Sequence, residues 1–138
     1  MASMALKVTT AFFDSKGLKY QVLDEEKGVL RVGFGMDNRD PMGILVIFSP
    51  DDTVASFRAT VAKAPEEKKA KMFEVCNSLN AHYKWIKFYF DVNDCTIMAE
   101  DDAVVDISTC GDEVFRCCLQ LVHIVDEAYP EIMKGIFM

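Results

Sequence analysis

Apolar residues recur at every second position through much of the first half of the chain. Residues 18–22 and 30–36 alternate in this way on either side of the sequence Glu-Glu-Lys-Gly, and residues 53–62 alternate again. A period of two is typical of strands that bury one face and expose the other. Residues 44–50 instead begin with five successive apolar residues, which predicts a central strand covered on both faces. Short turns between these four strands favour antiparallel pairing.

Three other segments follow the helical period. Residues 5–16 predict a short amphipathic helix that ends at Gly17, because glycine readily adopts the left-handed conformation found after a helix end. Residues 64–83 start with Pro65 and two glutamates, which favour the first turn of a helix. From residue 109 onward, apolar positions return every three or four residues and predict a final helix. Its expected buried stripe comprises Val114, Cys118, Leu121, Val125, Tyr129 and Ile132.

The remaining strands lie between the second and the last helix. Residues 84–91 place Ile86, Phe88 and Phe90 on one face of a strand. Residues 95–106 predict one strand, or two if the acidic Glu-Asp-Asp sequence interrupts it. The sequence therefore predicts a single α+β domain over residues 5–138, in the order α-β-β-β-β-α-β-β-α. It contains an antiparallel sheet of about six strands with helices packed on it.

Pro130 lies inside the pattern of the last helix. Proline lacks the backbone N–H and its ring clashes with the carbonyl group four residues earlier. We therefore expect a kink near Tyr129, or a second short helix that begins at Pro130. The apolar tail of residues 135–138 is then expected to fold back on the sheet or to cover a neighbouring subunit.

Two adjacent cysteines and a histidine in the last helix raise the question of a metal or thiol site. Helical geometry places Cys118 and His123 about 140° apart around the axis, which is too far for both to reach one metal ion. Cys118 is expected in the core, Cys117 at its edge and His123 in solvent. Cys110, at the expected helix start, is the one candidate for a reactive thiolate, which fast alkylation would reveal. No catalytic residue, cofactor or metal is expected.

Composition and charge narrow the class of protein. The chain has 138 residues, 51% of them hydrophobic, and no apolar run of about 20 residues that could span a membrane. Five cysteines without framework spacing, and no export signal, predict free thiols in the cytoplasm. A net charge of −7 opposes binding to nucleic acid or to anionic lipid, so neither is expected as a partner.

The outer face of the sheet is the candidate surface for a protein partner. Trp85, Lys87 and Tyr89 alternate with the apolar residues of their strand, and Arg31 and Arg58 lie opposite the apolar series of theirs. Exposed aromatic residues beside arginine are typical of interaction hot spots. The alternative is that the C-terminal tail or a second helix covers this face.

Two segments carry a resemblance to a known family. Residues 75–97 contain Leu79 and Asn80 before the aromatic strand, and residues 114–136 contain Val-Asp-Glu-Ala-Tyr-Pro-Glu-Ile-Met-Lys. Over residues 5–136 the chain resembles the YbjN-like family, named "putative bacterial sensory transduction regulator". Asn80 and Pro130 match recurrent family positions, which implies roles at a helix end and at a helix kink. The cysteine-rich last helix departs from the pattern.

The resemblance implies a function as well as a fold. The family is similar in fold to type III secretion chaperones, which are often dimeric and bind other proteins without catalysing a reaction. We therefore expect a cytoplasmic, non-enzymatic, protein-binding or chaperone-like regulator that forms a homodimer. The alternative is a sensor domain that binds a small molecule between the sheet and the helices.

Overall fold

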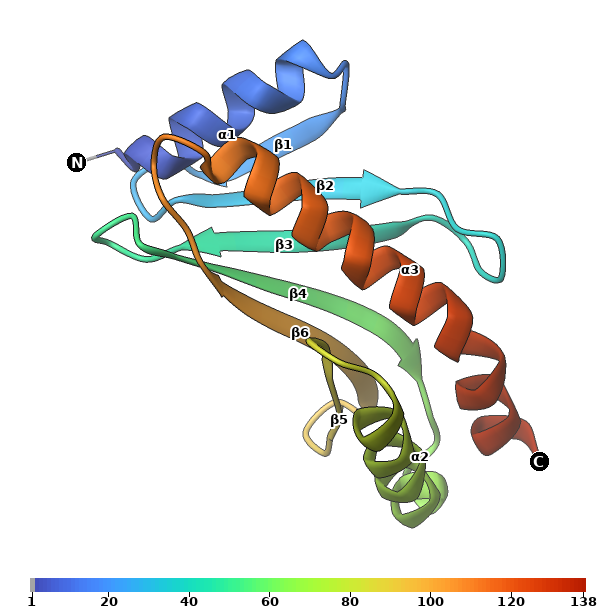
Figure 1. Cartoon of the computed structure of the whole chain (residues 1–138). Coiled ribbons are helices and arrows are strands. Elements are labelled where there is room, and N and C mark those ends of the chain that lie inside the picture. The colour runs from blue at the N-terminus through green and yellow to red at the C-terminus, as the bar shows by residue number, and fades with distance from the viewer. Residues whose placement is uncertain (1) are drawn as a thin grey trace.

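The computed structural model describes residues 2–138, and its element order is the expected one (Figure 1). Three α-helices and six strands form the domain, and one 3₁₀ turn precedes α2. The helices are α1 (Met4–Ser15), α2 (Lys69–His82) and α3 (Cys110–Phe137), and the 3₁₀ turn is η1 (Glu66–Lys68). The strands are β1 (Tyr20–Asp24), β2 (Val29–Phe34), β3 (Met42–Phe48), β4 (Val54–Lys63), β5 (Lys87–Asp91) and β6 (Thr96–Val104).

All six strands form one antiparallel sheet in the order β1-β2-β3-β4-β6-β5. The α+β class and the antiparallel sheet predicted from the sequence are therefore confirmed. Residues 95–106 supply one strand rather than two, because β6 pairs with β4 along almost its whole length, including the acidic residues Glu100, Asp101 and Asp102.

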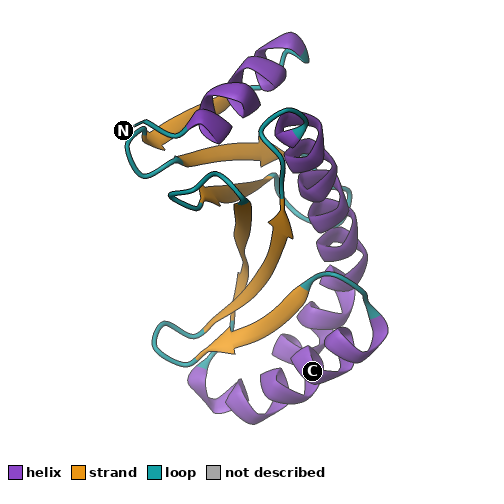
Figure 2. Ribbon diagram, turned by 60° about the vertical axis from the view of Figure 1, so that its left-hand side comes forward, coloured by secondary structure: helices purple, strands orange, loops and turns teal. Residues whose placement is uncertain are grey.

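The helices lie along one side of the sheet and leave the other side bare. Figure 2 shows the sheet as a curved layer with the helices along the outside of the curve. Helix α3 packs on β4 and β6, and α2 packs on β5. The core between these layers is fully buried at Phe57, Phe88 and Leu121, each of which removes a large apolar surface from water. We call the opposite side of the sheet the helix-free face.

Strand β3 corrects one expectation. It is internal in the sheet, as predicted, but it is not covered on both faces. Ile44, Val46 and Phe48 are buried under the helices, whereas Leu45 and Ile47 are only half-buried on the helix-free face. The apolar run therefore marks a strand with one buried face and one apolar, partly exposed face.

We expected either a kink near Tyr129 or a second short helix beginning at Pro130. Helix α3 runs unbroken through Pro130 to Phe137, so the second of these alternatives is wrong. The carbonyl group that proline leaves without its helical donor belongs to Asp126, four residues earlier. The side-chain amide of Asn38 donates to this carbonyl oxygen over 2.9 Å. A residue from the loop between β2 and β3 thus satisfies the acceptor that Pro130 cannot.

The same loop is tied to α3 through the Asp126 side chain. Its carboxylate accepts the backbone N–H groups of Asp37 at 3.1 Å and Asn38 at 2.7 Å. The last turn of α3 remains helical, so residues 135–138 do not fold back on the sheet. The alternative, that they cover a neighbouring subunit, stays a prediction. Ile136 is buried there, whereas Phe137 and Met138 are exposed.

Candidate protein-binding surface

A row of polar and apolar side chains crosses the whole helix-free face. Pairing between neighbouring strands is antiparallel and places one residue of each strand in register across the sheet. In strand order the row consists of Gln21, Arg31, Leu45, Arg58, Glu100 and Lys87. Side chains directly opposite each other in neighbouring strands lie close enough to interact. Arg31, Arg58 and Lys87, which the sequence placed on separate strands, therefore belong to one continuous feature.

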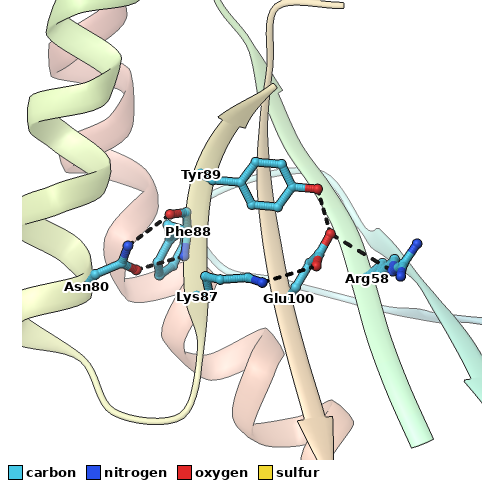
Figure 3. Close-up of polar contacts among 6 residues, drawn as sticks. All are labelled: Arg58, Asn80, Lys87, Phe88, Tyr89 and Glu100. Atoms are coloured by element: carbon cyan, nitrogen blue, oxygen red, sulfur yellow. Dashed lines mark hydrogen bonds and ion pairs between the residues drawn. The ribbon is translucent and has the colours of Figure 1, made fainter. Parts of the chain in front are cut away.

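Glu100 is the centre of this row (Figure 3). The Tyr89 hydroxyl donates to Glu100 Oε2 over 2.6 Å, Arg58 Nε lies 3.9 Å from the same oxygen, and Lys87 Nζ lies 3.8 Å from Oε1. The Glu100 side chain is only 15% exposed, whereas those of Arg58 and Lys87 are 52% and 63% exposed. A largely covered carboxylate therefore holds two cationic side chains and one phenol at the surface.

Tyr89 is electrostatically coupled to Glu100. The hydrogen bond to the carboxylate, followed by partial burial, raises the pKa of Tyr89 to about 12. The phenolate would lie beside a negative carboxylate, so the neutral, donating form is favoured. Lys87 Nζ also lies 5.9 Å from the centre of the Tyr89 ring, within the range of a cation–π contact. The aromatic ring is thus held in place by charged neighbours.

Trp85 does not share the strand face on which the sequence placed it. It precedes β5 in the turn that follows α2, where its φ of 75° is in the left-handed region. The alternation breaks because the strand begins only at Lys87. The side chain of Trp85 is nevertheless 71% exposed. Trp85 therefore lies beside the strand rather than within the row.

A hollow of about 440 Å³ lies in the helix-free face next to this row. We call it the arginine hollow. Its lining comes from β1, β2, β3, β4 and β6 and from the loop between β2 and β3. It includes Arg31, Arg39, Arg58, Gly43, Leu45 and Met98. A ligand in this hollow would lie on the opposite side of the sheet from the helices, not between sheet and helices.

Asn80 closes one edge of the sheet, a role that goes beyond the helix end implied by the resemblance. Its amide accepts the Phe88 N–H over 2.8 Å and donates to the Phe88 carbonyl oxygen over 2.9 Å (Figure 3). Both groups of an antiparallel residue point to the same side, so Phe88 directs them away from β6. Because β5 is an edge strand, Asn80 occupies hydrogen-bonding groups to which another strand could otherwise add.

The thiols and imidazoles behave as scaffold residues. All five cysteines are free, and Cys118 is buried whereas Cys117 is half-buried, as predicted. Desolvation raises the pKa of Cys117 to about 11. Cys110 is fully buried, and desolvation raises its pKa as well. Burial and the raised pKa both argue against the candidate reactive thiolate at Cys110, which alkylation would test. His123 is exposed and lies 3.6 Å from Glu127.

Two residues of the face were missed by sequence reasoning. The sequence left open whether Glu100 interrupts a strand or belongs to it, and did not assign it to the outer face. Its position one residue after the buried Ala99, in a continuous strand, places it on the outer side. Arg39 lies in a loop, where no periodic pattern could relate it to Arg31 or Arg58.

The fold and the site together define a class of protein: an α+β domain with the architecture of type III secretion chaperones and an uncovered sheet face. The family model YbjN, described as "Putative bacterial sensory transduction regulator", matches residues 6–134. The chain therefore belongs to the YbjN family. No curated protein matches the sequence.

Two solved structures are similar to the chain in fold. The crystal structure of YbjN from E. coli is 14% identical, with a TM-score of 0.65, and the match covers 95% of this chain and 96% of that one. A chain of the crystal structure of the ExsC–ExsE complex is 19% identical, with a TM-score of 0.59 and coverage of 93% and 90%. Within residues 2–138, no helix has the length and apolar character needed to cross a membrane.

Proposed function

We propose that this chain is a non-enzymatic, protein-binding regulator that acts in the cytoplasm and holds its partner on the helix-free face. The observation that supports this most directly is the row from Gln21 to Lys87, which combines charged and apolar side chains on a face that no helix of the described chain covers. A structural neighbour of the chain is itself found in a complex, that of ExsC with ExsE. The family description as a regulator agrees with a binding role.

The uncovered face has the composition of a recognition surface. Interfaces are enriched in aromatic residues and arginine, and their centres are partly apolar. Tyr89, Arg58 and the half-buried Leu45 meet this description. Tyr89 and Lys87 already contact Glu100. Their side chains would therefore lose less conformational entropy when a partner binds.

We further propose that the single domain of residues 5–138 forms a homodimer through the end of α3. Phe137 and Met138 are 78% and 84% exposed there, and contiguous exposed apolar surface is typical of interaction sites. This surface lies on the helix side and leaves the helix-free face accessible. Sedimentation equilibrium of the native protein is expected to give twice the chain mass of 15.5 kDa. The F137S/M138S variant is expected to be monomeric, and a monomeric native protein would contradict the dimer.

Partner capture tests the binding role. The tagged native protein is compared with a K87A/Y89A variant, with W85A and with an R116A/L119A control on the exposed side of α3. We expect K87A/Y89A to retain at least ten times less of a specific partner than the native protein and the control. Partner retention by the W85A variant shows separately whether the turn before β5 contributes to binding. Equal retention by K87A/Y89A and the native protein would overturn the proposed surface.

A further inference from the structure

The arginines of this chain are concentrated in one place. The sequence contains four arginines, and three of them, Arg31, Arg39 and Arg58, line the arginine hollow. The fourth, Arg116, lies on α3 and pairs with Asp112 at 3.0 Å. No lysine and no acidic residue of the described chain lines the hollow. Although the protein has a net charge of −7, the charged residues that line the hollow are therefore all arginines.

Each of these arginines lies against a different part of the fold. A Cβ atom at Gly43 would lie 2.6 Å from Arg31 Nε, so the Arg31 side chain lies directly over Gly43 of β3. Arg39 lies over the Tyr129 ring, 5.7 Å from its centre, at the end of the loop that Asp126 fixes. Arg58 lies 3.9 Å from Glu100. Arg39 and Arg58 thus each have a contact that restrains them, whereas Arg31 is exposed on its strand.

The charges of the hollow are only partly compensated. Within residues 2–138, neither Arg31 nor Arg39 forms an ion pair with a carboxylate, and Arg58 shares Glu100 with Lys87. A guanidinium group binds a carboxylate through two parallel hydrogen bonds, a geometry that lysine cannot supply. Leu45, which lies between Arg31 and Arg58 in the row, and Met98 of β6 add half-buried apolar surface to the hollow. The hollow therefore suits an anionic ligand that also carries apolar groups.

We infer that the arginine hollow binds an extended acidic segment of the partner protein, with apolar side chains between its carboxylates. This inference rests on the proposed function and names the chemistry of the partner. Arg31 and Arg58 stand in the same row on either side of β3, so their Cα atoms are about 10 Å apart. Alternate side chains of an extended segment lie about 7 Å apart on one face, within reach of two long arginine side chains.

Synthetic peptides of twelve residues test this inference with the native protein. Fluorescein-labelled repeats of Glu-Glu-Leu present both carboxylates and leucines on each face of an extended chain. Repeats of Ser-Ser-Leu and Lys-Lys-Leu are the neutral and cationic controls. Fluorescence anisotropy at 100 mM salt is expected to show at least tenfold tighter binding of the acidic peptide. Added salt is expected to weaken this binding, because it screens the charges.

Matched variants locate the site. R31Q/R58Q is expected to weaken binding of the acidic peptide at least tenfold. K7Q/R116Q also removes two positive charges, but from the helices. It is expected to change the binding of the acidic peptide less than twofold. Circular dichroism and the urea midpoint of each variant confirm that it is folded. Unchanged binding by folded R31Q/R58Q, equal binding of the neutral peptide, or binding of inorganic phosphate as tight as that of the acidic peptide would each overturn the inference.

Partner capture by the two sets of variants distinguishes a failure of this inference from a failure of the proposed function. Loss of the partner by K87A/Y89A but full retention by R31Q/R58Q would overturn the arginine hollow as the acidic site and leave the binding face standing. Full retention by both variants would overturn both. Loss by both variants, with retention by K7Q/R116Q, is the result that we expect.

Discussion

Phe57 and Arg58 are neighbours in β4, but they belong to opposite sides of the sheet. Phe57 is completely buried on the helix side, whereas Arg58 is exposed and lies 3.9 Å from Glu100 on the helix-free face. Both sides are built by the same alternation, yet only one is covered by helices. The covered side holds the fold together through apolar burial. The other side buries less apolar surface, and its charges and aromatic ring form the proposed binding surface.

The largest effect is expected from the covered side. F57A removes a fully buried aromatic side chain and is expected to lower the free energy of unfolding by about 3–5 kcal/mol. R58A removes an exposed side chain from a weak surface ion pair and is expected to change it by no more than about 1 kcal/mol. Urea unfolding followed by circular dichroism measures both. Equal losses for the two variants would break the distinction between the faces.

A smaller loss is expected at the edge of the sheet. N80A removes both hydrogen bonds to the Phe88 backbone and is expected to lower stability by about 1–3 kcal/mol. Hydrogen exchange of the Phe88 amide is expected to become faster than that of Phe57. N80D is the matched control, because it can still accept the Phe88 N–H but cannot donate to the carbonyl oxygen. Unchanged exchange in N80A would show that α2 alone protects this edge.

Tyr83 and Tyr89, which lie on opposite sides of the sheet, have pKa values raised to about 12 for different reasons. Tyr83, beside Glu127 on the helix side, has a pKa of about 12 caused first by desolvation. Tyr89 has the same pKa, but its first cause is the hydrogen bond to Glu100. E100Q should therefore lower the pKa of Tyr89 further toward 10 than E127Q lowers that of Tyr83. Absorbance titration near 295 nm, compared between variants, measures this difference.

The direction of the pH dependence follows from the raised pKa of Tyr89. The folded state favours the neutral phenol, so the stabilisation is fully present below the ordinary pKa of about 10. It is lost as pH rises from there through about 12. E100Q is expected to flatten the stability profile in this interval. An unaltered profile would mean that Glu100 does not hold Tyr89 in solution.

The smallest expected effect concerns thiol reactivity. Cys95 lies half-exposed in the turn between β5 and β6, whereas Cys110 is fully buried. Iodoacetamide at neutral pH is expected to label Cys95 first and Cys110 no faster than the buried Cys118. Mass spectrometry of the native protein identifies the labelled residues. Preferential labelling of Cys110 would restore it as a reactive thiol.

The sequence predicted what depends on local periodicity. Alternation identified the strands, and the stripe from Val114 to Ile132 identified the buried side of α3. It also placed Arg31, Arg58, Lys87 and Tyr89 opposite the buried residues of their strands. These predictions succeed because the face of a residue follows from its position in a regular element.

What the sequence could not predict depends on contacts between distant residues. Asn38, 88 positions before Asp126, donates the hydrogen bond that Pro130 cannot donate to the Asp126 carbonyl oxygen. Helix α3 therefore continues at a proline, where the local sequence predicts that a helix ends or kinks. The predicted strand position of Trp85 is wrong because the turn after α2 includes Trp85 and β5 begins only at Lys87. The arginine hollow brings together a loop residue and two strand residues, which share no periodic pattern.

Site-specific photo-cross-linking tests most directly whether the helix-free face is where this protein holds its partner. A benzoyl-phenylalanine is placed at the exposed Gln21 in the row on that face, or at the exposed His123 on α3, in the full chain in cells. We predict an adduct with a second, different protein from position 21 and none from position 123. Adducts from position 123 alone, equal adducts from both positions, or adducts only with a second copy of this chain would contradict the account.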